Sequence, residues 1–164
     1  MKSIATLLVL VALAIFSPAV AAEKSVTAEP LGKIALGQKA DDILKLLGKP
    51  GSKGADRLME ATGEWVQEWK FPALGLELGM GSTKKGTGKT VSSITAKGAC
   101  KLSTARGISI GSPVAVVRKA YEKIEEKQQG RTGEVFVAGS VYDGVIFTLK
   151  SGKVSEIFIG AAAE

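Results

Sequence analysis

The hydrophobic positions of this chain follow two different spacings, which alternate along its length. Residues 34–47 and residues 108–121 each begin with a short apolar run that ends in glycine, and apolar residues at intervals of three and four then follow. This spacing places apolar side chains along one side of a helix. The sequence therefore predicts two amphipathic helices, with apolar stripes at Ala40, Ile43, Leu44 and Leu47 in the first and at Val114, Val117, Ala120, Tyr121 and Ile124 in the second.

The other apolar stretches alternate with polar residues or glycine at a period of two, which is typical of strands with one buried and one solvated face. We expect the buried face to carry Trp65, Trp69, Phe71, Leu74, Leu76, Leu78, Met80, Val145, Phe147 and Leu149. The opposite, open face then carries the candidate partner-binding residues Val66, Glu68, Lys70, Glu77, Ile146 and Lys150. Residues 55–61 are expected to form a further short helix.

The two helical segments align with each other at a constant offset of 74 residues, which is the separation of Ile34 from Ile108. Gly37 aligns with Gly111 at this offset, and related strand-like stretches follow at 88–94 and 152–157. The repeated order predicts an α+β fold of two tandem repeats, each of a helix plus antiparallel strands, with the helices packed on one sheet face. The expected boundaries are a first repeat at 23–98, a linker at 99–106 and a second repeat at 107–164.

A family resemblance rests on residues 34–37 (Ile-Ala-Leu-Gly), the helix after them, residues 47–50 (Leu-Gly-Lys-Pro) and the aromatic strand at 65–71. These features resemble the helix-plus-sheet unit of the beta-lactamase-inhibitor-protein-like fold. Small lipoproteins of the outer-membrane barrel assembly machinery carry one such unit, and secreted beta-lactamase inhibitor proteins carry two in tandem. The resemblance covers residues 31–161 and implies this fold and a tendency to bind proteins through the sheet surface. The chain departs from the pattern in lacking a lipobox, in lacking paired cysteines and in having Glu122 at the position of Gly48.

The first 22 residues have the three parts of a secretory signal peptide. Lys2 supplies the positive start, residues 4–16 form the apolar stretch, and Ala19-Val20-Ala21 supplies the small residues of a cleavage site. The apolar stretch is shorter than the ~20 residues that a membrane-spanning helix needs. We therefore expect an exported protein, periplasmic or extracellular (secreted), with no transmembrane segment in its mature chain.

Composition removes several classes of chemistry. The chain has no histidine, which excludes Ser-His-Asp and Cys-His catalysis and histidine metal sites. Its single cysteine, Cys100, can form no disulfide within the chain, and it is interpreted as a small buried residue or as one half of an intermolecular disulfide. The net charge of +6 is scattered among few aromatic residues, so a nucleic-acid partner is not expected.

Residues 86–90 (Gly-Thr-Gly-Lys-Thr) end like a phosphate-binding loop. That motif begins with a glycine, where this chain has Thr83, and it leads into a helix. Here the following residues, 91–96, have the pattern of a strand. The stretch therefore predicts the flexible tip of a β-hairpin with lysines that favour solubility.

These observations lead us to expect no catalytic residue, no cofactor and no metal ligand. The function predicted from the sequence is that of an exported, non-enzymatic binding module, which binds a protein through its open sheet face in association with the cell envelope. Two alternatives stay open. One is an enzyme that acts on envelope glycans through carboxylates such as Glu68 and Glu77. The other is a structural or stress-related envelope protein without a dedicated ligand.

Overall fold

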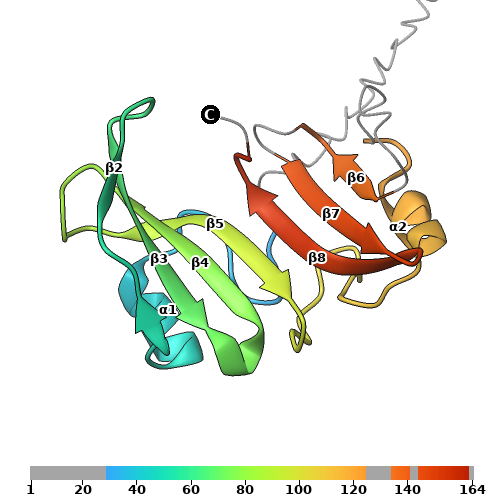
Figure 1. Ribbon diagram of the computed structural model, residues 1–164, viewed down its shortest axis with the longest axis horizontal. Coiled ribbons are helices and arrows are strands. Elements are labelled where there is room, and N and C mark those ends of the chain that lie inside the picture. The colour runs from blue at the N-terminus through green and yellow to red at the C-terminus, as the bar shows by residue number, and fades with distance from the viewer. Residues whose placement is uncertain (1–28, 125–133, 141–143, 163–164) are drawn as a thin grey trace, which may run out of the picture.

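The computed structural model describes residues 29–124, 134–140 and 144–162 (Figure 1). Within these residues the chain forms one eight-stranded antiparallel β-sheet and two α-helices, so the predicted α+β class is confirmed. The predicted signal peptide, residues 1–22, lies outside the described residues. In the part of the chain that is described, no helix is long and apolar enough to cross a membrane.

The sheet joins strands from both halves of the sequence, in the spatial order β1-β3-β4-β5-β8-β7-β6, with β2 also pairing with β3. The first half contributes α1 (Ala40–Leu47), β1 (Ser52–Lys53), β2 (Arg57–Met59), β3 (Glu64–Phe71), the 3-10 turn η2 (Pro72–Leu74), β4 (Leu76–Ser82) and β5 (Thr90–Lys97). The second half contributes α2 (Val114–Tyr121), β6 (Val135–Ala138), β7 (Gly144–Lys150) and β8 (Lys153–Gly160).

A single hydrophobic core runs along the sheet and includes side chains from both helices. Ile43 of α1 and Val117 and Tyr121 of α2 are buried in the same cluster as the strand side chains. The other predicted stripe residues pack against this cluster, so the three-four spacing located the buried side of both helices correctly. The strand members of the cluster are Trp69, Phe71, Leu76, Leu78, Met80, Val91, Ile94, Ala96, Phe136, Ala138, Val145, Phe147, Leu149, Val154, Ile157 and Ile159.

Equivalent backbone hydrogen bonds join the start of each helix to a strand of its own half. Gly37 and Gly111 both have positive φ angles, 78° and 87°, which glycine adopts at little cost and which turn the chain from its extended entry into the helix. The matching bonds run from Gly37 to Val91 and from Gly111 to Val154 (both 2.7 Å), from Val91 to Gln38 and from Val154 to Ser112 (both 2.9 Å), and from Ala40 to Lys89 (3.0 Å) and from Val114 to Gly152 (2.9 Å).

β5 and β8 form the seam between the two halves. They pair antiparallel, with Thr95 opposite Phe158 and, on the core face, Ile94 opposite Ile159 and Ala96 opposite Ile157. Each of these core-face residues is fully buried. The halves therefore share one continuous sheet and one core rather than meeting through a flexible contact.

Two local predictions are wrong. The expected helix at 55–61 is instead strand β2, which pairs with Glu64–Val66 of β3 after a turn at Gly63 (φ 70°). A helix of seven residues is unstable alone, whereas the edge of β3 offers backbone hydrogen bonds to an extended segment. Leu74 does not join the buried strand face, because it lies in the turn η2 between Pro72 and Gly75 and is 41% exposed.

Candidate functional site

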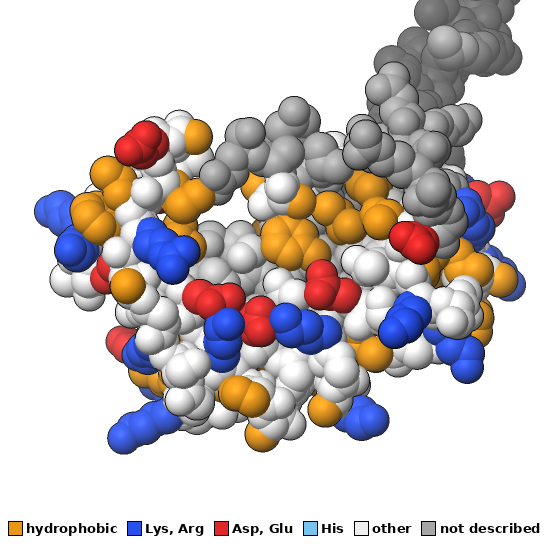
Figure 2. Space-filling view, viewed as in Figure 1, with side chains coloured by type: hydrophobic (Ala, Val, Ile, Leu, Met, Phe, Trp, Pro, Cys, Tyr) orange, Lys and Arg blue, Asp and Glu red, His pale blue; other side chains and the backbone are white. Residues whose placement is uncertain are grey.

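The strand positions that alternate with the core positions form a second face of the sheet, which we call the outer face. A row of directly paired residues crosses it from β3 to β7: Lys70, Glu77, Thr95, Phe158 and Ile146. All five side chains are partly exposed. Figure 2 shows acidic and basic side chains gathered across the middle of the molecule on this side, with hydrophobic side chains beside them.

The sequence-predicted site residues occupy alternate positions on this face, but the structure brings only some of them together. Glu68 and Lys70 lie two residues apart on β3, and Lys70 pairs directly with Glu77 on β4. Val66 lies further along β3, opposite Gly81. Ile146 is on β7, and Lys150 lies at the end of β7, opposite Lys153 at the turn into β8. The compact group is therefore Glu68, Lys70 and Glu77, with Lys150 remote from it.

Charged residues of three strands and one strand end form what we call the charged band: Glu68, Lys70, Glu77, Lys97 and Glu156. Lys70 Nζ lies 3.1 Å from Glu68 Oε2, and Lys97 Nζ lies 3.0 Å from Glu77 Oε1. The hydrogen bond to Glu77 raises the pKa of Lys97 above its ordinary value, and the negative charges of Glu156 and Glu68 add to this against a lowering by desolvation. Because these groups are well exposed, the pairs contribute little to stability.

Two pockets adjoin the charged band. The turn pocket, of about 280 Å³, is lined by Lys70, Pro72, Gly75, Leu76, Glu77, Lys97, Gly98 and Ala99. The arm pocket, of about 300 Å³, is lined by Gly54, Ala55, Arg57, Met59, Val66 and Glu68. One pocket thus lies toward each end of β3, and the Glu68–Lys70 ion pair lies between them.

Sequence reasoning missed three residues of this face, Lys97, Glu156 and Phe158. Their strands do alternate, since Ile94 and Ala96 on β5 and Ile157 and Ile159 on β8 are core residues. That alternation could have assigned all three to the open face. Their closeness to Glu77 depends on the register of β5 with β8, in which Lys97 lies opposite Glu156. No local pattern in the sequence specifies this register.

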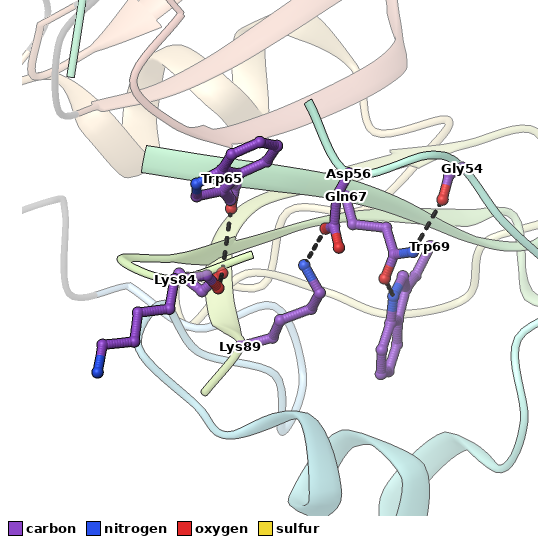
Figure 3. A network of polar contacts seen from close by, with 8 residues as sticks. Gly54, Asp56, Trp65, Gln67, Trp69, Lys84 and Lys89 are labelled. Carbon is purple, nitrogen blue, oxygen red and sulfur yellow. Dashed lines mark hydrogen bonds and ion pairs between the residues drawn. The ribbon is translucent and has the colours of Figure 1, made fainter. Parts of the chain in front are cut away.

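On the core face of β3, a polar network secures the loop between β1 and β2 (Figure 3). The indole Nε1 of Trp69 donates a 2.8 Å hydrogen bond to Gln67 Oε1, and Gln67 Nε2 donates one of 2.8 Å to the carbonyl of Gly54. Lys53 Nζ lies 3.8 Å from the centroid of the Trp69 ring. These contacts hold one wall of the arm pocket against β3.

The two tryptophans differ in burial. Trp69 is a core residue, 3% exposed, as predicted. Trp65 is only partly buried and lies outside the core cluster, so its assignment to the core is wrong. It pairs with Ser82 at the outer end of β3 and β4, beyond the strand positions that reach the cluster. Lys85 Nζ lies 5.0 Å from its ring centroid.

The glycine-rich stretch joins β4 to β5, which confirms its interpretation as a hairpin tip. The ammonium of Lys89, the residue that suggested a phosphate-binding loop, forms an ion pair with Asp56 (Figure 3). The two side chains are only 8% and 12% exposed. Lys89 therefore connects the hairpin to the loop between β1 and β2.

A second buried network connects the start of the described chain to α2. The Tyr121 hydroxyl oxygen lies 2.8 Å from Glu29 Oε1 and 2.9 Å from Thr104 Oγ1. The backbone N–H of Arg106 donates a 3.2 Å hydrogen bond to the same carboxylate oxygen of Glu29. Burial raises the pKa of Tyr121 well above its ordinary value.

We expect Tyr121→Phe to lower the free energy of unfolding by about 1–3 kcal/mol, because Glu29 and Thr104 lose a buried partner. It should also change the dependence of stability on pH. A raised pKa in the folded state means that stability is complete below the ordinary tyrosine pKa of about 10 and declines as pH rises above it. Urea unfolding followed by circular dichroism at pH 8 and pH 11 should show a smaller decline for the variant. Equal declines would contradict this account.

Cys100 belongs to the core cluster and is 3% exposed. This agrees with its interpretation as a small buried residue. An intermolecular disulfide would require the surrounding core to open first.

Comparisons with protein-family models, with curated proteins and with solved structures found no match to this chain. Among the residues that the structure describes, no three His, Cys, Asp or Glu side chains lie close enough together to hold a metal ion. The functional argument therefore rests on the chain's own geometry.

Proposed function

We propose that this chain is a non-enzymatic binding protein that docks another protein on its outer face. The observation that carries this proposal is the composition of the face, where mutually paired charges lie beside partly exposed Phe158 and Ile146 and two pockets. Protein interfaces combine apolar contact area with a polar surround in this way. Charges that already have partners lose less on desolvation than isolated charges do.

We further propose that the scaffold is two tandem copies of one helix-plus-sheet unit, whose helices shield one face of the sheet and leave the outer face open. Three kinds of support exist. The helices begin 74 residues apart, the same hydrogen bonds tie each helix start to its strand, and the apolar stripes of both helices belong to one core. Val91 and Val154 are equivalent in those bonds, and the same separation makes Thr95 equivalent to Phe158, its partner at the seam. Such self-equivalent pairing is the geometry of a two-fold axis.

The predicted signal peptide supports action in the periplasm or outside the cell, in association with the envelope. The likeness to the beta-lactamase-inhibitor-protein-like fold remains part of this proposal and is supported by the doubled unit. We do not propose the carboxylate enzyme, because Glu68 and Glu77 are each ion-paired with a lysine instead of facing each other across a cleft.

Affinity capture from periplasmic extract, with charge variants of the face, tests the proposal. The wild-type chain and the double variant Glu68→Lys/Glu77→Lys serve as baits. A matched control, Asp42→Lys/Glu122→Lys, makes the same change in net charge at exposed positions on α1 and just after α2. We expect a protein that both the wild type and the control retain and that the face variant loses at least about tenfold. Equal recovery on all three baits would refute docking on this face.

A further inference from the structure

We infer that the docked part of the partner is an extended polypeptide segment lying along β3, with an apolar side chain in each of the two pockets and a polar residue midway between them. This inference rests on the proposed function, because it specifies what the outer face binds. It commits to a segment with apolar residues at positions i and i+4 and an uncharged polar residue at i+2.

The spacing of the pockets selects an extended segment. Along β3 and its continuation, the arm pocket is lined by Val66 and Glu68 and the turn pocket by Lys70 and Pro72. The midpoints of these two pairs are four residues apart, which in a strand is about 13 Å. An extended segment presents its residues i and i+4 on one side at this same distance. In a helix, residues four apart are separated by only about 6 Å along the axis.

The chemistry of the pockets selects the side chains. Ala55, Met59 and Val66 supply apolar walls to the arm pocket. Pro72, Leu76 and Ala99 do the same for the turn pocket, so each favours an apolar side chain.

The ground between the pockets is polar and already neutralised. Glu68 and Lys70 are paired at 3.1 Å with side chains 50% and 44% exposed. A charged residue pressed against this pair would be desolvated without a counter-charge, which is unfavourable. A serine, threonine, asparagine or glutamine can hydrogen-bond to the exposed side of the pair instead.

Both pockets are held in shape before any partner arrives. The Lys89–Asp56 ion pair and the Gln67–Gly54 hydrogen bond anchor the loop that lines the arm pocket. In the turn pocket, Gly75 follows the turn η2 in a left-handed conformation (φ 60°), and its carbonyl accepts a 2.9 Å hydrogen bond from the Lys97 N–H. Preorganised pockets lose little conformational entropy on binding, which favours a rigid, two-anchor mode.

The test selects binders from a random dodecapeptide phage library with the full mature chain as target, and measures the affinity of the best synthetic peptide by fluorescence anisotropy. Two variants each fill one pocket through an exposed alanine: Ala55→Leu for the arm pocket and Ala99→Leu for the turn pocket. The matched control is Ala115→Leu, an exposed alanine on α2. Thermal unfolding of all three checks that they fold.

We expect the selected peptides to share the pattern apolar-x-polar-x-apolar, and each pocket-filling variant to weaken binding about tenfold or more while the control binds normally. Peptides with helical spacing, no enriched peptide, or binding insensitive to both filled pockets would overturn the inference. If the captured protein is lost by Glu68→Lys/Glu77→Lys but kept by Ala55→Leu and Ala99→Leu, docking on the outer face stands and the two-pocket mode fails. If neither set of variants affects that protein, both fail.

Discussion

Replacement of Lys89 by alanine is expected to lower the free energy of unfolding by about 3–5 kcal/mol, because it leaves the carboxylate of Asp56 buried without its counter-charge. Asp56 retains only 12% of its side-chain exposure, so water cannot replace the lost ammonium. The pair joins two segments far apart in sequence, the hairpin tip after β4 and the loop between β1 and β2. Urea unfolding of the variant at neutral pH, followed by circular dichroism, measures the effect.

Two further variants show whether burial is the cause. Removal of both charges in Asp56→Leu/Lys89→Met should restore much of the lost stability, since a buried ion pair contributes little more than apolar residues of similar size. The exposed pair of Asp42 and Lys45, with side chains 50% and 79% exposed, serves as the comparison. Asp42→Ala should cost about 0.5 kcal/mol or less. A loss below about 1 kcal/mol in Lys89→Ala would show that the pair is not effectively buried.

The helices could be predicted from the sequence because their stability depends on a pattern that the sequence displays directly. Residues such as Ile43 and Val117 recur at three-four spacing and pack against one face of a sheet, so their burial follows from periodicity alone. The inward and outward residues of β3, β4 and β7 followed in the same way from the period of two. Register along a strand is strongly determined where one face is buried.

The seam and the arm could not be predicted, because they depend on contacts between segments far apart in the chain. Nothing near Lys97 indicates that Glu156 lies opposite it, since β5 and β8 are brought together by the shared core. The segment 55–61 has a weak preference of its own, and the free edge of β3 decided its conformation. The candidate site was therefore predicted on β3 and β4 and missed on β5 and β8.

The two halves also differ in how they use buried polar groups, although their helix starts are equivalent. The position that Lys89 occupies in the first half is Gly152 in the second, as the bonds to Ala40 and Val114 show. Tyr121 in the second half stands 74 residues from Leu47, a partly buried apolar residue of α1. The first half is thus fastened by an ion pair at its hairpin, and the second by the network around Tyr121 at the end of its helix. These differences allow the two halves to have distinct outer surfaces on a shared scaffold.

Gly75→Ala is the substitution for which we expect the second large effect, a loss of about 3–5 kcal/mol in the free energy of unfolding. Gly75 has a φ of 60°, where an L-residue is strained by about 1–2 kcal/mol. Its added Cβ would also overlap the carbonyl oxygen of Lys97 and lie 2.6 Å from the backbone nitrogen of Cys100. Both neighbours are backbone atoms beside the core, so they cannot move aside as a flexible side chain could, and overpacking adds about 1–3 kcal/mol.

Gly98→Ala separates the two causes, because Gly98 has nearly the same φ, 57°, but nothing within 4 Å of an added Cβ. It should cost only the backbone strain, about 1–2 kcal/mol. Urea unfolding of both variants gives the difference directly. A similar loss in the two would mean that the turn at Gly75 can shift away from Lys97. The turn pocket, which both glycines line, would then be an adaptable surface and not the preorganised one that two-anchor docking requires.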